Sequence, residues 1–163
     1  MTEGTREPIE WFRHQYRFLS NSAPARVRFG GRVVPTVEHA HQMAKTNGVT
    51  AKTAIARCAT PDDARELGAT FETRPDWPEV RLPIMHGLLR QKFAHRAGAD
   101  LLVATAPRPL VDTNTWGDTY WGVVDGVGEN HLGRLLMAVR DELIAERAGS
   151  KGALPAPMRR QRV

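Results

Sequence analysis

Apolar residues recur at helical spacing in two long segments of the chain. In both segments they follow a period of 3.6 residues, which is typical of a helix that buries one face. We therefore expect one helix at 77–95, capped by Asp76 and bent at Pro83, and another that is capped by Asn130. The positions that form the two apolar faces are Leu82, Met85, Leu89 and Phe93 in the first segment, and Leu132, Leu135, Leu136, Val139 and Leu143 in the second.

Turn and cap residues predict the shorter elements. Gly30-Gly31 separates two β-prone runs at 27–29 and 32–34, and because both glycines accept positive φ we expect a hairpin there. The other expected elements are a helix from Thr36 to about Lys45 or Thr46, a helix from Thr60 to Gly68, a short helix through 101–103, a strand at 110–111 and a loop at 113–129. Together they predict an α+β, predominantly helical single domain with a small antiparallel β-sheet.

The excess positive charge of the chain lies at its C-terminal end. Of the 23 Lys and Arg residues in the 163-residue sequence, five follow residue 146, whereas all 18 Asp and Glu residues lie within residues 1–146. We expect residues 1–146, which are balanced in charge, to form the folded domain. Residues 147–163 contain few large apolar side chains, so we expect a basic, disordered tail. Nucleic-acid binding through this tail stays an alternative, and it would be sensitive to salt.

Several classes of protein are disfavoured by what the sequence lacks. Cys58 is the single cysteine, so it forms no internal disulfide, and no apolar run reaches the ~18 residues of a spanning helix. The polar residues 1–7 lack the apolar run of a signal peptide, and we expect a cytoplasmic protein with no membrane contact. HExxH, paired-cysteine, P-loop and GxSxG motifs are absent, and we expect no metal and no cofactor.

One expected helix carries a polar stripe with catalytic potential. Glu38, Gln42 and Lys45 are spaced at i, i+4 and i+7, so their side chains project within a narrow arc. Such a stripe is often only a solvated helix face. In a cleft, the carboxylate of Glu38 could instead act on a proton or on water, and Lys45 could attack a sugar carbonyl as a Schiff-base nucleophile. The spacing alone leaves both interpretations open.

The segment between Asp112 and Asn130 has an unusual composition for a connector. Trp116, Tyr120 and Trp121 are interleaved with glycines and aspartates. Large aromatic rings can stack on a nucleobase, glycines let a backbone approach a phosphate, and the helix that follows offers unpaired N–H groups to an anion. The alternative is a packed Ω-like loop whose tryptophans fill gaps in the core.

Several motifs follow one another in order along residues 11–146. They are Tyr16-x-Phe18-Leu19-Ser20-Asn21; Gly31-Arg32-Val33-Val34-Pro35-Thr36-Val37-Glu38-His39 with Gln42 and Lys45; Arg74-Pro75-Asp76-Trp77; Met85-x-x-x-Leu89-x-x-Lys92-Phe93; Asp118-x-x-Trp121-Gly122 with Asp125-Gly126 and Gly128; and Asn130-x-Leu132-Gly133-x-Leu135-Leu136-Met137-x-Val139-Arg140. In this order they resemble the NADAR or YbiA-like family of N-glycosidases. The resemblance implies a YbiA-like fold and cleavage of a ribosyl N-glycosidic bond without a cofactor.

The resemblance also implies a substrate class and roles for particular residues. The preferred substrate is an ADP-ribosylated guanine in a nucleoside or nucleic acid, and the alternative is a phosphoribosylated aminopyrimidine intermediate of riboflavin synthesis. Glu38 would be a catalytic carboxylate, Lys45 the candidate for a covalent sugar intermediate, and Asp118 an assisting group. The residues expected to bind substrate are Phe18, Ser20, Asn21, Gln42, Trp77, Trp121, Asp125, Asn130 and Arg134.

One position departs from the family's usual pattern. After Glu38-His39 the family usually carries an aromatic pair, whereas this chain has Ala40 and His41. The loss of two rings bears on base stacking and therefore on substrate choice. A module that binds a nucleotide without cleaving it is the rival interpretation. The expected partner is a nucleotide or an ADP-ribosylated nucleic acid, with no obligate protein partner.

Overall fold

The computed structural model describes residues 7–152, which form helices joined by short strands and loops. Along the chain, the elements are β1 (Ile9–Glu10), the 3-10 helix η2 (His14–Leu19), β2 (Val27–Phe29), β3 (Arg32–Val34), α1 (Val37–Ala44), α2 (Val49–Ala56), α3 (Pro61–Gly68), α4 (Trp77–Lys92), α5 (Arg96–Val103), β4 (Leu110–Val111) and α6 (His131–Lys151). This content confirms the predicted α+β, mainly helical class.

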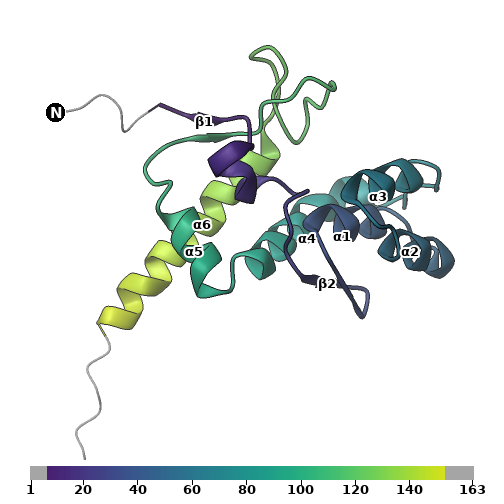
Figure 1. Cartoon of the computed structure of the whole chain (residues 1–163), viewed down its shortest axis with the longest axis horizontal. Coiled ribbons are helices and arrows are strands. Elements are labelled where there is room, and N and C mark those ends of the chain that lie inside the picture. Colours follow the sequence, from purple (N-terminus) through teal and green to yellow (C-terminus); the bar gives the residue numbers. More distant parts are fainter. Residues whose placement is uncertain (1–6, 153–163) are drawn as a thin grey trace, which may run out of the picture.

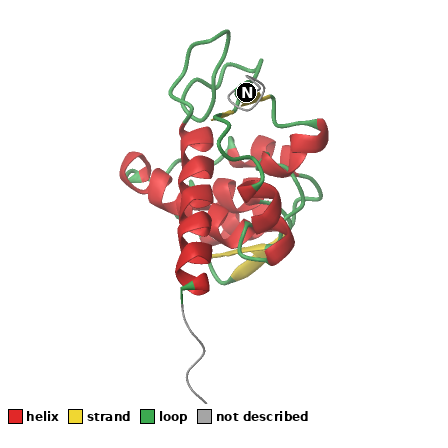
Figure 2. Ribbon diagram, turned by 90° about the vertical axis from the view of Figure 1, so that its left-hand side faces the viewer, coloured by secondary structure: helices red, strands yellow, loops and turns green. Residues whose placement is uncertain are grey.

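Helix α4 joins two groups of helices. It packs against α1, which contacts α2 and α3, and it also packs against α6, which contacts α5. Figure 1 shows α1, α2 and α3 gathered on one side of the molecule, with α5 and the long α6 on the other. The hairpin of β2 and β3 lies against α1, while Figure 2 shows long loops gathered beyond one end of the molecule.

Each of the two sheets has two strands. In the predicted hairpin, β2 and β3 pair antiparallel, and Gly30 and Gly31 at the turn have φ values of 55° and 76°. Both values require the left-handed region that glycine adopts without strain. The second sheet pairs β1 and β4 in parallel, with Ile9 opposite Leu110. The sequence predicted only an antiparallel sheet, because two-residue strands far apart in the chain carry no periodic signal.

The starts of the main helices are confirmed, with Asp76 and Asn130 at the N-cap positions of α4 and α6, but neither of these two side chains makes a capping hydrogen bond. Thr36 and Thr60 each accept a hydrogen bond from a backbone N–H in the first turn of their helix. Asp76 makes no capping bond, because its carboxylate binds Arg74, with Nε and Oδ1 2.6 Å apart. Asn130 makes none either, since its φ is 53° and its side chain donates to the backbone of β4.

Two helices were not predicted, and one is shorter than expected. The unpredicted helices are η2 and α2, which lack a side-chain cap. Helix α4 ends at Lys92 rather than at His95. His95 instead begins α5, where its Nδ1 accepts a hydrogen bond from the backbone N–H of Gly98 over 3.2 Å. A histidine cap is uncommon, which explains why the sequence did not reveal this boundary.

Helix α6 continues beyond the expected domain boundary at residue 146. It reaches Lys151, and the guanidinium of Arg147 binds the carboxylate of Asp100 in α5, with the two atoms 2.6 Å apart. Residues 147–151 are therefore helical, and the rest of the predicted disordered tail, 153–163, lies outside the described residues. Within residues 7–152, no helix is long and apolar enough to cross a bilayer.

Helix α1 is buried along its whole length. All eight of its residues are buried, including the polar side chains of Glu38, His39, His41 and Gln42. The interpretation of the polar stripe as a solvated helix face is therefore wrong. Polar groups in such a position need partners or a ligand, because burying them without hydrogen bonds costs free energy.

Candidate active site

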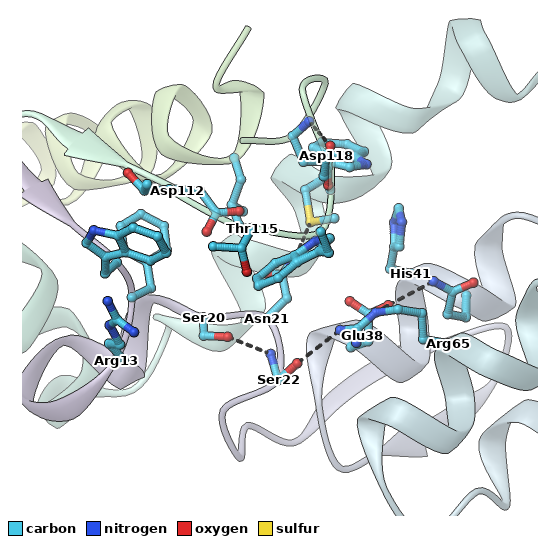
Figure 3. A pocket seen from close by; sticks show the side chains of 18 of the residues that line it. Arg13, Ser20, Asn21, Ser22, Glu38, His41, Arg65, Asp112, Thr115 and Asp118 are labelled. Carbon is cyan, nitrogen blue, oxygen red and sulfur yellow. Dashed lines mark hydrogen bonds and ion pairs between the residues drawn. The ribbon is translucent and has the colours of Figure 1, made fainter. Parts of the chain in front are cut away.

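The polar stripe of α1 faces a pocket of about 720 Å³. The pocket wall combines residues 11–13 and 20–22, the stripe of α1 together with His41, and six residues between 112 and 121, with one residue each from α3, α4 and α6. Figure 3 shows side chains from these separate segments pointing into one space. Its volume lies in the upper part of the range of about 300–1,000 Å³ that small-molecule sites occupy.

Glu38 is held in place at the pocket wall by a chain of polar contacts. Gln42 Nε2 donates to Glu38 Oε1 over 2.8 Å, and Lys45 Nζ donates to Gln42 Oε1 over 3.4 Å. Arg65 in α3 adds an ion pair, with its Nε 3.5 Å from the same Oε1. Gln42 therefore orients both the carboxylate and the amine that the sequence predicted as catalytic groups, and the guanidinium of Arg65 lies beside the carboxylate of Glu38.

Close packing brings this chain of contacts into position. The backbone N–H of Glu38 donates to the carbonyl of Asn21 over 3.0 Å, which ties the start of α1 to the N-terminal segment. On the other side, α3 approaches α1 at Gly68, where any Cβ would collide with the side chain of Gln42. The absence of a side chain at residue 68 thus leaves Gln42 room to reach Glu38 and Lys45.

Asp118 organises the loop that closes the opposite side of the pocket. Its Oδ1 accepts hydrogen bonds from the backbone N–H groups of Tyr120 and Trp121, over 3.1 and 2.8 Å. Asn114 holds the backbone of Asp118 from both sides, accepting from its N–H over 3.1 Å and donating to its carbonyl over 2.8 Å. Asp118 therefore has a structural task in the loop as well as a place in the pocket lining.

A third carboxyl in the pocket, that of Asp112, was not among the predicted site residues. It follows β4, and its backbone N–H donates to Asn130 Oδ1 over 3.0 Å. Burial, followed by the charges of Asp118 and Glu38, raises the pKa of Asp112 to about 7. A carboxyl with this pKa can give or take a proton near neutral pH, as a general acid or base must.

The two ends of the pocket differ in character. At one end His41 lies between Trp77 and Trp121, with its ring centroid 5.4 Å from each indole. At the other end the guanidinium of Arg13 lies over the ring of Trp11, 4.3 Å from its centroid. Figure 3 shows Arg13 and His41 on opposite sides of the space. One end is therefore aromatic and flanked by carboxylates, whereas the other end carries a cation on an aromatic platform.

The pocket brings together seven of the predicted residues but not the other five. Phe18 packs against the core, and Trp77 lies behind His41 with only 8% of its surface exposed. Asn130 is engaged with the backbone around β4, while Asp125 and Arg134 are exposed outside the pocket. The seven predicted residues that line it are Ser20, Asn21, Glu38, Gln42, Lys45, Asp118 and Trp121.

The residues that sequence reasoning missed reach the pocket from elements without an informative motif. Arg65 is one of several charged residues on α3, and Arg13 lies in a segment where no element was predicted. Among residues 7–152, no cluster of three or more His, Cys, Asp or Glu side chains could hold a metal ion. The arrangement that is present offers three carboxyl groups, an amine and two guanidinium groups, which suits acid–base chemistry on an anionic substrate.

This fold and this pocket define a small α+β domain with the carboxylate-lined site that glycosidases use. The chain belongs to the NADAR domain family, whose family model matches residues 3–144. The resemblance found in the sequence is therefore confirmed.

Relatives with similar sequences carry enzyme names. N-glycosidase YbiA of Escherichia coli is 36% identical over 136 residues, covering 81% of this chain and 84% of YbiA. An N-glycosidase of Nostoc punctiforme is 35% identical over 137 residues, covering 78% of this chain and 86% of the Nostoc protein. A riboflavin biosynthesis protein of Vibrio vulnificus is 32% identical over 143 residues, covering 84% of this chain and 39% of that protein.

The fold also matches a solved structure. The NMR structure of the E. coli protein YbiA is similar with a TM-score of 0.78 and 34% identity, covering 87% of this chain and 88% of YbiA. The chain thus shares both fold and sequence with hydrolases that act on N-glycosyl bonds.

Proposed function

We propose that the chain hydrolyses the N-glycosidic bond of a ribosylated base and that Glu38 is its catalytic carboxylate. The observation that carries this proposal is the position of Glu38, buried at the pocket wall and fixed by Gln42 and Arg65. Cleavage of such a bond develops positive charge on the ribosyl ring, and a fixed carboxylate stabilises that charge. The N-glycosidase names of several relatives support the same reaction class.

Two carboxyl groups of the pocket, those of Asp112 and Glu38, allow a complete proton balance. When the bond between C1 of the ribose to be removed and the base nitrogen breaks, both bonding electrons stay on that nitrogen, which takes a proton from Asp112. Water adds its oxygen to C1 and gives one proton to Glu38. Proton exchange with solvent then restores both groups. The raised pKa of Asp112 supports its role as the acid, because it holds its proton up to about pH 7.

Lys45 supports a second route through a covalent intermediate. The ribose ring would first open, which leaves C1 joined to the base nitrogen as an imine. The amine of Lys45 would add to C1, the base would leave with a proton from that amine, and water would then hydrolyse the imine left between C1 and Lys45. Borohydride distinguishes the routes because it reduces an imine to a stable amine. An adduct that forms on the wild type and is lost in Lys45→Ala would establish the covalent route.

The substrate that the pocket supports best is an ADP-ribosylated guanine. The aromatic end beside Glu38 suits the base and the bond to be cut, while Arg13 at the far end suits a diphosphate. Trp11, beneath Arg13, adds a surface on which a second nucleobase can stack. A volume of about 720 Å³ leaves room for both halves of such a substrate.

A phosphoribosylated aminopyrimidine is the second candidate substrate. The names of two relatives favour it, the Vibrio vulnificus protein and a chloroplastic protein of Zea mays, both called riboflavin biosynthesis proteins. This substrate has one ribose phosphate and no second nucleoside, so it would leave the end of the pocket around Trp11 unused.

Mass spectrometry of the reaction products tests the class and the substrate together. Wild type and Glu38→Gln are incubated separately with ADP-ribosyl-guanosine and with the aminopyrimidine ribosyl phosphate. We expect the wild type to release guanosine from the former, and Glu38→Gln to be slower by about 10²–10⁴-fold. Release from the aminopyrimidine alone would select the second candidate. No release from either, with binding retained, would favour a nucleotide-binding module.

A further inference from the structure

His41 and His39 lie on the same helix, but only His39 is fully hydrogen-bonded. The Nδ1 of His39 lies 2.8 Å from Thr36 Oγ1, and its Nε2 lies 3.1 Å from the carbonyl of Cys58. The Nδ1 of His41 is buried and has no hydrogen-bond partner. His39 is therefore a core residue with both ring nitrogens hydrogen-bonded, whereas the Nδ1 of His41 is buried without a hydrogen bond that would stabilise the fold.

The surroundings of His41 would suit an apolar ring equally well. Its imidazole packs between the indoles of Trp77 and Trp121, and the residue is only 7% exposed. A phenylalanine could fill this space without burying an unpaired nitrogen. Because His41 also lines the pocket, the group for which its nitrogens are suited is a ligand in the pocket.

The protonation state of His41 follows from its neighbours. Burial is the largest influence and lowers its pKa; Lys45 and Arg65 lower it further, whereas Glu38 and Asp118 raise it. The imidazole is therefore neutral near pH 7, with one nitrogen protonated. A buried N–H without an acceptor is rarer than a buried acceptor without a donor, which assigns the proton to Nε2 rather than to the unpartnered Nδ1.

We propose that His41 reads the base of the substrate, with its Nε2–H donating a hydrogen bond to an acceptor on the base edge. This inference rests on the proposed function, because it assigns the base to the end of the pocket beside Glu38. A phosphate is less suited to this end than a neutral ring, because the carboxylates of Glu38 and Asp118 flank it and Arg65 is already paired with Glu38. A flat, neutral ring with carbonyl or ring-nitrogen acceptors matches the aromatic and polar character of this end.

Two substitutions distinguish the packing contribution of the His41 ring from the hydrogen bond donated by its Nε2. His41→Phe keeps an aromatic ring between the two indoles but has no donor. His41→Gln loses the ring but places an amide nitrogen close to the position of the histidine Nε2. Thermal unfolding of both variants is measured first, and we expect His41→Phe to be at least as stable as the wild type because it removes a buried unpaired group.

Binding of the two reaction products provides the test, because it does not depend on turnover. Guanosine serves as the probe for the base, and ADP-ribose as the matched probe for the sugar and phosphates. We expect His41→Phe to weaken guanosine binding about tenfold and to leave ADP-ribose binding within about twofold of the wild type, while His41→Gln recovers part of the guanosine affinity.

Unchanged guanosine affinity in a folded His41→Phe variant would overturn the proposal. An equal loss for both probes would overturn it as well, because it would indicate a general distortion of the pocket. The proposed function fails separately, if the wild type releases no base from either substrate. In that case a selective loss of guanosine affinity in His41→Phe would still establish His41 as a base-reading residue.

Discussion

Asp112 links the chemistry of the pocket to the stability of the protein. Its pKa is about 7 in the folded protein and 3.8 in its ordinary state, so between these values only the folded state holds the proton. The stabilisation from this group is thus fully present below about pH 4 and is lost as the pH rises through about 7. We expect Asp112→Asn to flatten this part of the pH dependence of the free energy of unfolding, measured by urea denaturation.

Asp125→Asn provides the control for this experiment. Asp125 is an exposed carboxylate in the same loop and lies outside the pocket lining. The Asp125→Asn substitution should leave the pH dependence of the free energy of unfolding as it is in the wild type. If the wild type and Asp112→Asn gave parallel curves between about pH 4 and 8, Asp112 would not hold its proton in the fold, and it could not serve as the acid at neutral pH.

At the scale of residues, the sequence predicted what one helix can arrange by itself. Glu38, Gln42 and Lys45 meet in the pocket because helical periodicity alone puts them on one face. Arg65 and Asp112 could not be predicted in the same way, since they arrive from α3 and from the end of β4. Their approach to Glu38 is decided by packing between elements, for which a single sequence carries no periodic signal.

At the scale of elements, the contact between α1 and α3 depends on Gly68. A Cβ there would lie 3.0 Å from the Cβ of Gln42 and closer still to its amide oxygen. We expect Gly68→Ala to destabilise the protein by about 1–3 kcal/mol and to lower kcat, because Gln42 must release Glu38 or Lys45 to make room. Chemical denaturation and steady-state kinetics measure the two effects.

Gly87→Ala is the matched control for the contact between these helices. Gly87 lies inside α4, and a Cβ there would meet nothing within 4 Å. The same substitution should therefore stabilise the protein, by up to about 1 kcal/mol through helix propensity, and leave kcat unchanged. Stabilisation by both substitutions would show that the two helices tolerate a wider separation than the structure indicates.

Local signals predicted the elements that carry their own start and stop residues. The two glycines of the hairpin and the caps at Thr36 and Thr60 act within a few residues, so they could be recognised in the sequence. The parallel pair of β1 and β4 could not be predicted, because each strand is defined only by the other. The capping bond expected from Asn130 does not form for the same reason, because its side chain donates to the carbonyl of Leu110 in β4 rather than bonding to its own helix.

At the scale of the whole molecule, the pocket spans from the N-terminal segment to α1. Arg13 lies at the end opposite His41, which is where we place the diphosphate of the substrate (Figure 3). We expect Arg13→Ala to raise KM for ADP-ribosyl-guanosine about 10–100-fold while kcat changes little, because Arg13 is remote from the bond to be cut. Arg17→Ala, which removes an exposed charge outside the pocket lining, is the control.

Equal effects of Arg13→Ala and Arg17→Ala would indicate a general electrostatic attraction rather than a phosphate site. That attraction would disappear at high salt, whereas a direct contact would persist in part. A loss of kcat without a change in KM would place the diphosphate elsewhere in the pocket.

The order of motifs along the sequence predicted the family. It could not predict that the pocket extends as far as Arg13, because this extent depends on how residues 11–13 pack in space against the loop that follows β4.

The hairpin turn at Gly30-Gly31 has a practical consequence for work on this protein. Both glycines are exposed, and a side chain at either would meet no neighbouring atom, while none of residues 27–34 lines the pocket. Exposed turns of this kind are where chains accept inserted sequence most readily. A peptide epitope or a fluorescent reporter placed at this turn would therefore mark the enzyme without obstructing entry of its substrate.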